Sequence, residues 1–230
     1  MIALSKFYEY FCSKQNNMKR NIADLRKDYV KDVLMKSDLA SNPIDQFNEW
    51  FGQALDSEVK EPNALILSTV SHDGFPSARV VLLKGVDALG FRFFTNYNSS
   101  KGKELMQNPN ASMTFFWPEL EQQIRINGCV EKLDPKASDD YFDSRPQGSK
   151  ISAIASNQSS KVNRREELTE EVDRLNKRYE NNTIVRPEHW GGYLLVPHKI
   201  EFWQGRSSRL HDRFLYEKVN DTWEINRLAP

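Results

Sequence analysis

The densest group of side chains suited to binding or catalysis is the stretch FWQGRSSRLHDRF, residues 202–214. Trp203, Arg209, His211 and Arg213 share parity, so a regular strand would present all four on one face. Arginine binds phosphate or stacks on flat rings, and tryptophan supplies an apolar wall. The stretch therefore predicts contact with a flat, charged ligand. A surface strand with solvated arginines is the alternative.

Two further stretches carry cations at the ends of expected elements. In SARVVLLKG, Arg79 and Lys84 lie five residues apart, so a regular strand would place them on opposite faces. A site reached by both would need a twist, a bulge or a second subunit. In TNYNSSKGKEL, Thr95, Ser100 and Lys101 surround an expected helix N-terminus. That position suits a phosphate, although ordinary helix capping explains the serines equally well.

The stretch YFDSRPQGSK adds a third phosphate-suited set. Tyr141, Arg145 and Ser149 are spaced by four, and Pro146 interrupts any continuous helix. We therefore expect them to converge around a turn, where a guanidinium and hydroxyl donors match a phosphate monoester. The polar stretch SNQSSK, residues 156–161, offers neutral donors, or is simply a loop.

Composition limits the class of protein. The 230 residues carry 32 Lys+Arg and 32 Asp+Glu, which argues against coating of nucleic acid or anionic membrane by an overall field. The two cysteines, Cys12 and Cys129, form no disulfide framework or metal pair, and a reducing cytoplasm is the expected location. No run approaches the ~20 apolar residues of a membrane span.

Common catalytic motifs are missing from the chain. It has no G-x-G-x-x-G after a strand, no Walker-type loop and no G-x-S-x-G elbow. The four histidines show no metal-binding spacing, so no metal site is expected.

The elements that must position these residues follow from hydrophobic period. Helical spacing predicts helices over 22–35, 43–55 and 164–181, with short helices near 98–107 and on both sides of Pro146. Short β-branched or aromatic runs from residue 64 predict strands, with HDG, residues 72–74, as a hairpin turn. Without regular βαβ alternation, an α+β fold on a small closed or half-closed antiparallel barrel is favoured. We expect an N-terminal extension, residues 1–20, and one domain, residues 21–230.

The motifs RVVLLK, FFTN, SRP, QSS, IEFWQG, RLHDRF and the terminal NRLAP resemble the pyridoxine/pyridoxamine 5′-phosphate oxidase family. The resemblance runs from about residue 26 to Pro230. It implies a Greek-key FMN-binding split β-barrel with flanking helices, and a homodimer with FMN at the subunit interface. It also implies oxidation of pyridoxine 5′-phosphate or pyridoxamine 5′-phosphate to pyridoxal 5′-phosphate in vitamin B6 metabolism. Hydride would pass from substrate C4′ to flavin N5, and O2 would yield H2O2, with NH3 released from the amine.

The resemblance also assigns residues. FMN contacts are expected at Arg79, Val80, Val81, Leu82, Leu83, Lys84, Phe94, Thr95, Ser100, Lys101, Gln123, Gln158, Ser159, Trp203 and Arg213. Substrate contacts are expected at Arg26, Lys27, Asp28, Tyr29, Lys84, Tyr141, Arg145, Ser149, Arg209, Leu210 and His211, with Arg209 and His211 as the catalytic pair. The segment 26–29 matches one thought to cover the site.

Two departures from the family pattern affect the FMN prediction. Ser100 stands where the family usually has an arginine for the FMN phosphate, and Gln122 replaces a usual arginine. Loss of one charge-assisted contact would weaken FMN binding by roughly 1.5–3 kcal/mol if nothing compensates.

Two alternatives stay open. A flavin reductase-like split-barrel protein with another substrate would explain the barrel but not Tyr141, Arg145 and Ser149 together with RLHDRF. A non-enzymatic carrier of flavin or pyridoxal phosphate is the second, and a barrel that binds single-stranded nucleic acid is disfavoured by the balanced charge.

Overall fold

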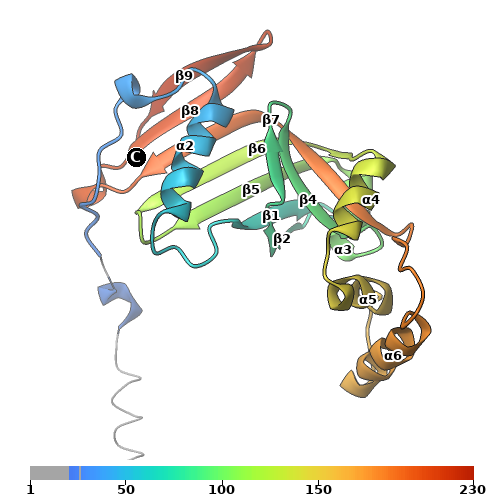
Figure 1. Ribbon diagram of the computed structural model, residues 1–230. Helices are drawn as coiled ribbons and strands as arrows, with labels where there is room; N and C mark the ends of the chain where they lie inside the picture. The colour runs from blue at the N-terminus through green and yellow to red at the C-terminus, as the bar shows by residue number, and fades with distance from the viewer. Residues whose placement is uncertain (1–20, 26) are drawn as a thin grey trace, which may run out of the picture.

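The computed structural model describes residues 21–25 and 27–230. The expected N-terminal extension, residues 1–20, and the expected substrate contact Arg26 lie outside the described residues. The described chain forms an α+β fold around one curled antiparallel sheet of nine strands (Figure 1). This matches the fold class predicted from the hydrophobic period.

The strands are β1 Ala64–Val70, β2 Pro76–Leu82, β3 Gly85–Asp87, β4 Gly90–Asn96, β5 Asn110–Trp117, β6 Gln122–Lys132, β7 Trp190–Gln204, β8 Asp212–Val219 and β9 Thr222–Leu228. The helices are α2 Pro43–Leu55, α3 Ser100–Gln107, α4 Pro135–Asp143, α5 Gln147–Ala155 and α6 Arg165–Arg178. Short 3-10 turns are η2 Ile22–Asp24, η3 Lys36–Asp38 and η4 Ser207–Arg209.

The long strand β7 organises the sheet. Its residues 193–204 pair with β6, while residues 190–195 pair with β4 and residues 199–204 with β8. The main path runs β2-β1-β5-β6-β7-β4-β3, and β8 and β9 continue from the far half of β7. A register shift between Asn127 and Gly128 of β6 accompanies the bend of this pair, as bulges do in curled sheets. The branching separates two ends of the molecule, and both carry predicted site residues.

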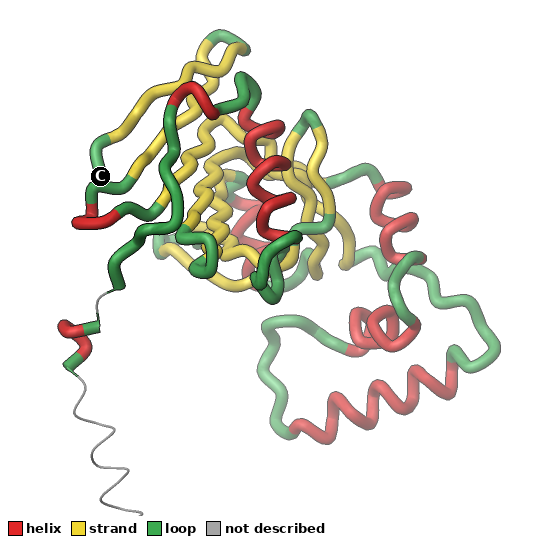
Figure 2. The backbone as a smooth tube through the Cα atoms, turned by 60° about the vertical axis from the view of Figure 1, so that its left-hand side comes forward, coloured by secondary structure: helices red, strands yellow, loops and turns green. Residues whose placement is uncertain are grey.

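Helix α2 covers the concave side of the sheet (Figure 2). Its N-terminus is capped by the Asn42 side chain, which accepts from the Ile44 amide, and Pro43 occupies the first turn. Phe47 is fully buried against Phe91 and Phe115 at 4.9 and 5.2 Å between ring centroids. Ile44 and Trp50 are buried with it, whereas Leu55 at the end of the helix is exposed.

The helix predicted over residues 22–35 is wrong. Only Ile22–Asp24 form a 3-10 turn, and the following residues run along the sheet without helical bonds. The amides of Val30 and Lys31 donate to the Glu121 carboxylate at 2.8 and 3.0 Å, and the Leu34 amide donates to Asp212 at 3.2 Å. These tertiary acceptors replace the carbonyls of a helix, so the local spacing does not decide the conformation.

The remaining helices follow the predictions. Ser99 caps α3 by accepting from the Gly102 amide, and Pro146 separates α4 from α5. Helices α4 to α6 form a group beside one end of the sheet (Figures 1 and 2). Across residues 21–25 and 27–230, no helix has both the length and the apolar character needed to cross a bilayer.

Candidate functional site

A cavity of about 670 Å³ lies where β2, β4 and helices α3 to α5 meet. Its lining comprises Arg79, Val80, Val81, Leu82, Lys84, Phe94, Thr95, Asn96, Lys101, Tyr141, Arg145, Pro146, Ser149, Ser152, Ala153, Ser156, Gln158 and Trp190. We call this cavity the cation pocket. Four of its lining residues are Lys or Arg, and none is Asp or Glu. In a chain with no net charge, such a pocket selects an anionic ligand.

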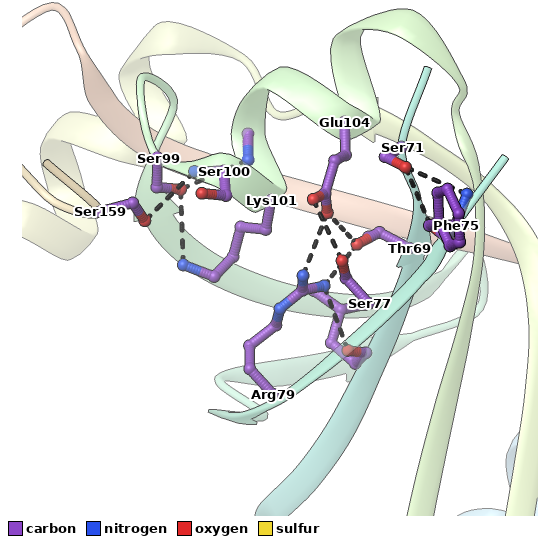
Figure 3. A network of polar contacts seen from close by, with 12 residues as sticks. Thr69, Ser71, Phe75, Ser77, Arg79, Ser99, Ser100, Lys101, Glu104 and Ser159 are labelled. Atoms are coloured by element: carbon purple, nitrogen blue, oxygen red, sulfur yellow. Dashed lines mark hydrogen bonds and ion pairs between the residues drawn. The ribbon is translucent and has the colours of Figure 1, made fainter. Parts of the chain in front are cut away.

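Arg79 is held on one side of the cation pocket by the network drawn in Figure 3. Its guanidinium donates to the Glu104 carboxylate at 3.0 Å, to the Leu67 carbonyl at 3.3 Å and to the Thr69 hydroxyl. Burial alone would raise the pKa of Glu104, but hydrogen bonding from Thr69 and the Arg79 charge outweigh it and lower the pKa. Glu104 is therefore a fixed anion that orients Arg79 without lining the pocket.

Lys101 stands at the first turn of α3. Its ammonium donates to Gln158 at 2.9 Å and to Thr95 at 3.2 Å, and burial, followed by the charge of Arg79, lowers its pKa. The Ser159 hydroxyl accepts from the Ser100 amide at 3.2 Å, which joins the 156–160 loop to the helix N-terminus. A phosphate is well accommodated beside such a set of cation, hydroxyl and amide donors.

Arg145 lines the cation pocket between α4 and α5. Its guanidinium carbon is 4.6 Å from the centroid of the Trp190 ring, and one terminal nitrogen, Nη1, is buried without a hydrogen-bond partner among the described residues. Burial lowers the pKa of Arg145. An unpaired buried donor of this kind costs roughly 1–3 kcal/mol. Such a donor is the expected signature of a group that is satisfied by a ligand.

The expected convergence of Tyr141, Arg145 and Ser149 is present, since all three line the cation pocket. Tyr141 stacks on Phe94 at 3.8 Å between ring centroids. Arg79 and Lys84 also line the same pocket, although a regular strand would separate them. The reason is that β2 ends at Leu82, so Lys84 lies beyond the strand, where its amide donates to the Arg92 carbonyl of β4.

Several expected FMN contacts do not line the pocket. Leu83 is buried in the core, and Ser100 and Ser159 lie just outside at the start of α3. Gln122 is also buried, with its amide donating to Gln53 of α2 at 3.3 Å, so this departure from the family pattern faces the core.

Gln123, Trp203 and Arg213 form a second group. They are cross-strand partners on β6, β7 and β8, and we call them, with Tyr29, Arg209 and His211, the hairpin face. The prediction that Trp203, Arg209, His211 and Arg213 lie on one face of a single regular strand is wrong. The turn η4, with Ser208 and Arg209 at φ of 55° and 61°, breaks the strand, and Trp203 and Arg213 meet across a hairpin instead.

The hairpin face surrounds the Trp203 ring. The His211 ring lies 4.6 Å from it, and the Tyr29 ring lies 5.7 Å from Trp203 and 5.9 Å from His211. The His211 Nδ1 accepts from the Arg206 amide at 3.0 Å, so the neutral imidazole carries its proton on Nε2. Burial, and then the Arg209 charge, lowers the pKa of His211. His211 therefore presents a neutral donor.

The arginines of this face differ in their partners. Arg213 pairs with Glu201 at 2.9 Å and donates to the Ala229 carbonyl at 2.8 Å, and the hydrogen bond to Glu201 raises its pKa. Arg209 and Leu210 are exposed, and Arg209 pairs with none of the described carboxylates. Lys27 lies 3.9 Å from Glu121, and Asp28 is exposed.

The predicted site residues thus fall into two regions of one chain. None of the hairpin face lines the cation pocket, and Figure 1 shows the turn between β7 and β8 at the opposite end of the sheet from α3 to α5. One chain by itself does not assemble the whole predicted site.

Sequence reasoning missed some lining residues of the cation pocket, among them Asn96, Ser152, Ser156 and Trp190. Trp190 stacks on Phe94 at 5.7 Å and supports Arg145. The tryptophan that opens the strand run WGGYLLV was a signal that could have indicated it. Ser152 and Ser156 follow from Ser149 at intervals of three and four on α5, which a helical projection would have shown.

Two family models match the chain. Residues 51–179 match the family described as "Pyridoxamine 5'-phosphate oxidase", and residues 190–230 match "Pyridoxine 5'-phosphate oxidase C-terminal dimerisation region". The pyridoxine/pyridoxamine 5′-phosphate oxidase of Trichormus variabilis is 54% identical over 214 residues, covering 93% of this chain and 100% of the relative. That of Burkholderia lata is 51% identical, covering 91% and 99%.

Solved structures show the fold. PhzG from Burkholderia lata, in complex with tetrahydrophenazine-1-carboxylic acid, has a TM-score of 0.82 at 35% identity and covers 86% of this chain and 98% of its own. A pyridoxamine 5′-phosphate oxidase-related, FMN-binding protein of Nostoc punctiforme has a TM-score of 0.66 at 19% identity, covering 84% and 99%. The family match over more than half of the chain and the relatives above 50% identity lead to one conclusion. The chain belongs to the FMN-dependent, split-barrel pyridoxine/pyridoxamine 5′-phosphate oxidase family.

Proposed function

We propose that this protein oxidises pyridoxine 5′-phosphate or pyridoxamine 5′-phosphate to pyridoxal 5′-phosphate, with FMN as cofactor and O2 as acceptor. The observation that carries the proposal is the cation pocket, which is lined by four cations and no carboxylate and holds a buried Arg145 nitrogen with no partner in the described part of the chain. One phosphate would not require donors at both ends of this cavity. FMN and a phosphorylated substrate together carry two phosphate groups.

The chain's residues fit FMN at the α3 end of the pocket. Arg79, Lys101, Thr95 and Gln158 would hold the FMN phosphate, with Ser100 and Ser159 beside it. The Val80–Leu82 strand and Phe94 supply apolar walls. When bound, FMN supplies the hydride acceptor for the substrate C4′ carbon, and O2 regenerates it with release of H2O2.

The substrate phosphate would lie at the other end of the pocket. Lys84, Tyr141, Arg145 and Ser149 provide a charge pair and two hydroxyls there. A phosphate oxygen would satisfy the Arg145 Nη1 group that has no partner among the described residues. This binding energy positions the substrate for hydride transfer, which needs close approach and orientation more than a strong protein base.

The hairpin face would complete the site from a second copy of the chain. Ile66, Val80, Leu82 and Phe116 are exposed apolar side chains on β1, β2 and β5, with 68% of Val80 accessible. Such a patch beside the pocket suits an interface between two copies. The partner would bring Gln123, Trp203 and Arg213 toward FMN, and Arg209 and His211 toward the pyridine ring. His211 Nε2–H would donate to the substrate, while Arg209 would orient the pyridine ring.

A phenazine-type acid is the second candidate, since PhzG is similar in fold and 35% identical. That acid carries a carboxylate and no phosphate, which would leave part of the Lys84, Tyr141, Arg145 and Ser149 set without a partner. Discrimination against a ligand that leaves a built polar site unpaired reaches 10⁴-fold or more in other enzymes. We therefore favour the phosphorylated pyridine.

The test is a visible spectrum of the FMN-loaded protein under anaerobic conditions, before and after addition of pyridoxine 5′-phosphate. Bleaching of the flavin bands, with recovery and one H2O2 per turnover on admission of air, is the expected result. Unphosphorylated pyridoxine at the same concentration serves as the control and should bleach the bands far more slowly. A yellow protein whose bands stay unchanged with the phosphate ester would contradict the proposal.

A further inference from the structure

Glu121 occupies an unfavourable position for its residue type. It ends the turn between β5 and β6 with φ of 56°, a left-handed conformation that glycine or asparagine adopts at lower cost. Its side chain is only 2% exposed, although it carries a charge. A buried carboxylate in a strained backbone is retained where the surrounding contacts require it.

The carboxylate binds the chain far away in sequence. One oxygen, Oε2, accepts from the backbone amides of Val30 at 2.8 Å and Lys31 at 3.0 Å. The other, Oε1, lies 3.9 Å from the ammonium of the exposed Lys27. Residues 27–31 are thus fixed by a single side chain that lies about ninety positions further along the sequence.

The backbone of Glu121 is held independently of its side chain. Its carbonyl accepts from the Gly205 amide at 2.7 Å and from the Gln204 side-chain amide at 3.3 Å. The turn is therefore tied to the end of β7 by bonds that a side-chain substitution leaves in place. This separates the carboxylate's role from that of the turn.

Tyr29 is the residue whose position depends on these bonds. Its ring contacts Trp203 and His211 edge-on, at 5.7 and 5.9 Å between centroids. It also packs on Gly205, where a Cβ atom would lie 2.7 Å from the Tyr29 ring, so only glycine admits the ring. Further along, Asp212 and Arg227 bind the amide and carbonyl of Leu34. Between these attachments, the segment lies across the hairpin face.

We propose that Glu121 is a positioning residue, which holds Tyr29 against Trp203 and His211 and thereby sets the orientation of His211 toward the substrate. The inference rests on the proposed function, since it assumes that the hairpin face meets the pyridine ring. Glu121 itself does not line the cation pocket. Its effect passes through the Val30 and Lys31 amides to Tyr29.

The experiment compares Glu121→Ala, Glu121→Gln, Tyr29→Ala and the double variant Glu121→Ala/Tyr29→Ala in the full-length, FMN-loaded protein. Asp32→Asn is the matched control, because Asp32 lies on the same segment and its carboxylate accepts only from the next amide, that of Val33. Four quantities are measured: the rate of trypsin cleavage after Lys27 and Lys31, kcat and KM for pyridoxine 5′-phosphate, and the Kd of FMN.

Glu121→Ala should accelerate cleavage after Lys31 and lower kcat/KM by about tenfold, the effect of one lost charge-assisted contact, with the Kd of FMN within twofold of wild type. Glu121→Gln keeps one acceptor oxygen, so its cleavage rate and its kcat/KM should lie between those of Glu121→Ala and wild type. The double variant should be no slower than Tyr29→Ala alone, because both changes act on the same contact.

Three results would overturn the inference: wild-type cleavage rates in Glu121→Ala, additive losses in the double variant, or a loss of FMN affinity that matches the loss of turnover. If the wild-type protein does not oxidise pyridoxine 5′-phosphate, the proposed function fails. The cleavage rates still decide whether Glu121 anchors the segment. Asp32→Asn should behave as wild type in all measurements.

Discussion

The cation pocket and the hairpin face both gather arginines and aromatic rings, yet the arginines are in different electrostatic states. In the pocket, Arg145 lacks an acidic partner and leaves a buried nitrogen without a bond among the described residues. Arg79 of the pocket does pair with Glu104, but that carboxylate does not line the cavity. On the hairpin face, Arg213 is paired with Glu201, whereas the exposed Arg209 pairs with none of the described carboxylates. Beside this face, Arg206 and Arg227 are both paired with Asp212. Cations without acids bind anions, whereas paired cations mainly fix geometry. The pocket is therefore the better candidate for phosphate, and the face for shaping a ring site.

The largest effect is expected where this contrast is strongest. Arg145→Ala should lower kcat/KM for pyridoxine 5′-phosphate by about 10²-fold, because two charge-assisted hydrogen bonds of ~1.5 kcal/mol each would be lost. Steady-state kinetics and an FMN titration measure it, and the Kd of FMN should stay near wild type. Arg178→Ala, which removes a cation packed on Tyr179 outside the pocket, is the control. An equal loss of FMN affinity would contradict separate phosphate positions.

The exposed arginine of the hairpin face tests the other region. Arg209→Ala should lower kcat by roughly 10- to 10²-fold, since loss of its contact to the pyridine ring would disturb the alignment that hydride transfer requires. The affinity for FMN should change little, as Arg209 lies outside the cation pocket. Single-turnover bleaching of the flavin measures the step directly. An unchanged turnover rate would remove Arg209 from the catalytic assignment.

The Arg79–Glu104 pair offers a smaller and more local test. Glu104→Gln keeps the hydrogen bonds but removes the charge that orients Arg79, and should raise the Kd of FMN by about three- to tenfold. Ser100→Arg should act in the opposite direction, lowering the Kd by about tenfold, since it restores a cation at the start of α3. Quenching of flavin fluorescence measures both. If the Ser100→Arg protein binds FMN with unchanged affinity, then Ser100 in place of the family's usual arginine does not weaken FMN binding.

The smallest expected effect is a shift in pH dependence. Burial and Arg209 lower the pKa of His211, so the neutral imidazole persists to below its usual 6.5. Protonation of Nδ1 would break its bond from the Arg206 amide, and kcat/KM should therefore fall as pH drops through that lowered pKa. In Arg209→Ala, the pH at which kcat/KM falls on the acid side (the acid limb) should move up toward 6.5. Both proteins are measured with one substrate, so titration of its phosphate cancels. An unmoved limb would mean that the limb does not belong to His211.

Much of the fold was predictable because local signals agreed with the tertiary result. The period-2 runs, the hairpin at residues 72–74, the Asn42 and Ser99 caps and the break at Pro146 all appear in the structure. The resemblance also predicted the family, the split barrel and FMN, and these predictions are confirmed. The prediction of a helix over residues 22–35 failed because backbone amides of this segment donate to Glu121 and Asp212, which are distant in sequence.

The candidate site was predictable in residue type but not in arrangement. Lys84 and Arg79 share a pocket because β2 ends early, and Trp203 and Arg213 meet across a hairpin because η4 interrupts the strand. Neither event follows from alternation along a regular strand. The individual site roles stay predictions that the variants above will test.

The sequence by itself determined which chemistry is available: cations and hydroxyls at helix starts and strand ends, an Arg-rich aromatic hairpin and no nucleophile motif. These are properties of residue type and short-range spacing. Only the tertiary structure decided which cations remain without acids, because pairing such as that of Arg213 with Glu201 depends on strand register. It also decided that the pocket and the hairpin face lie at different ends of one chain, because β7 divides its partners between β4 and β8.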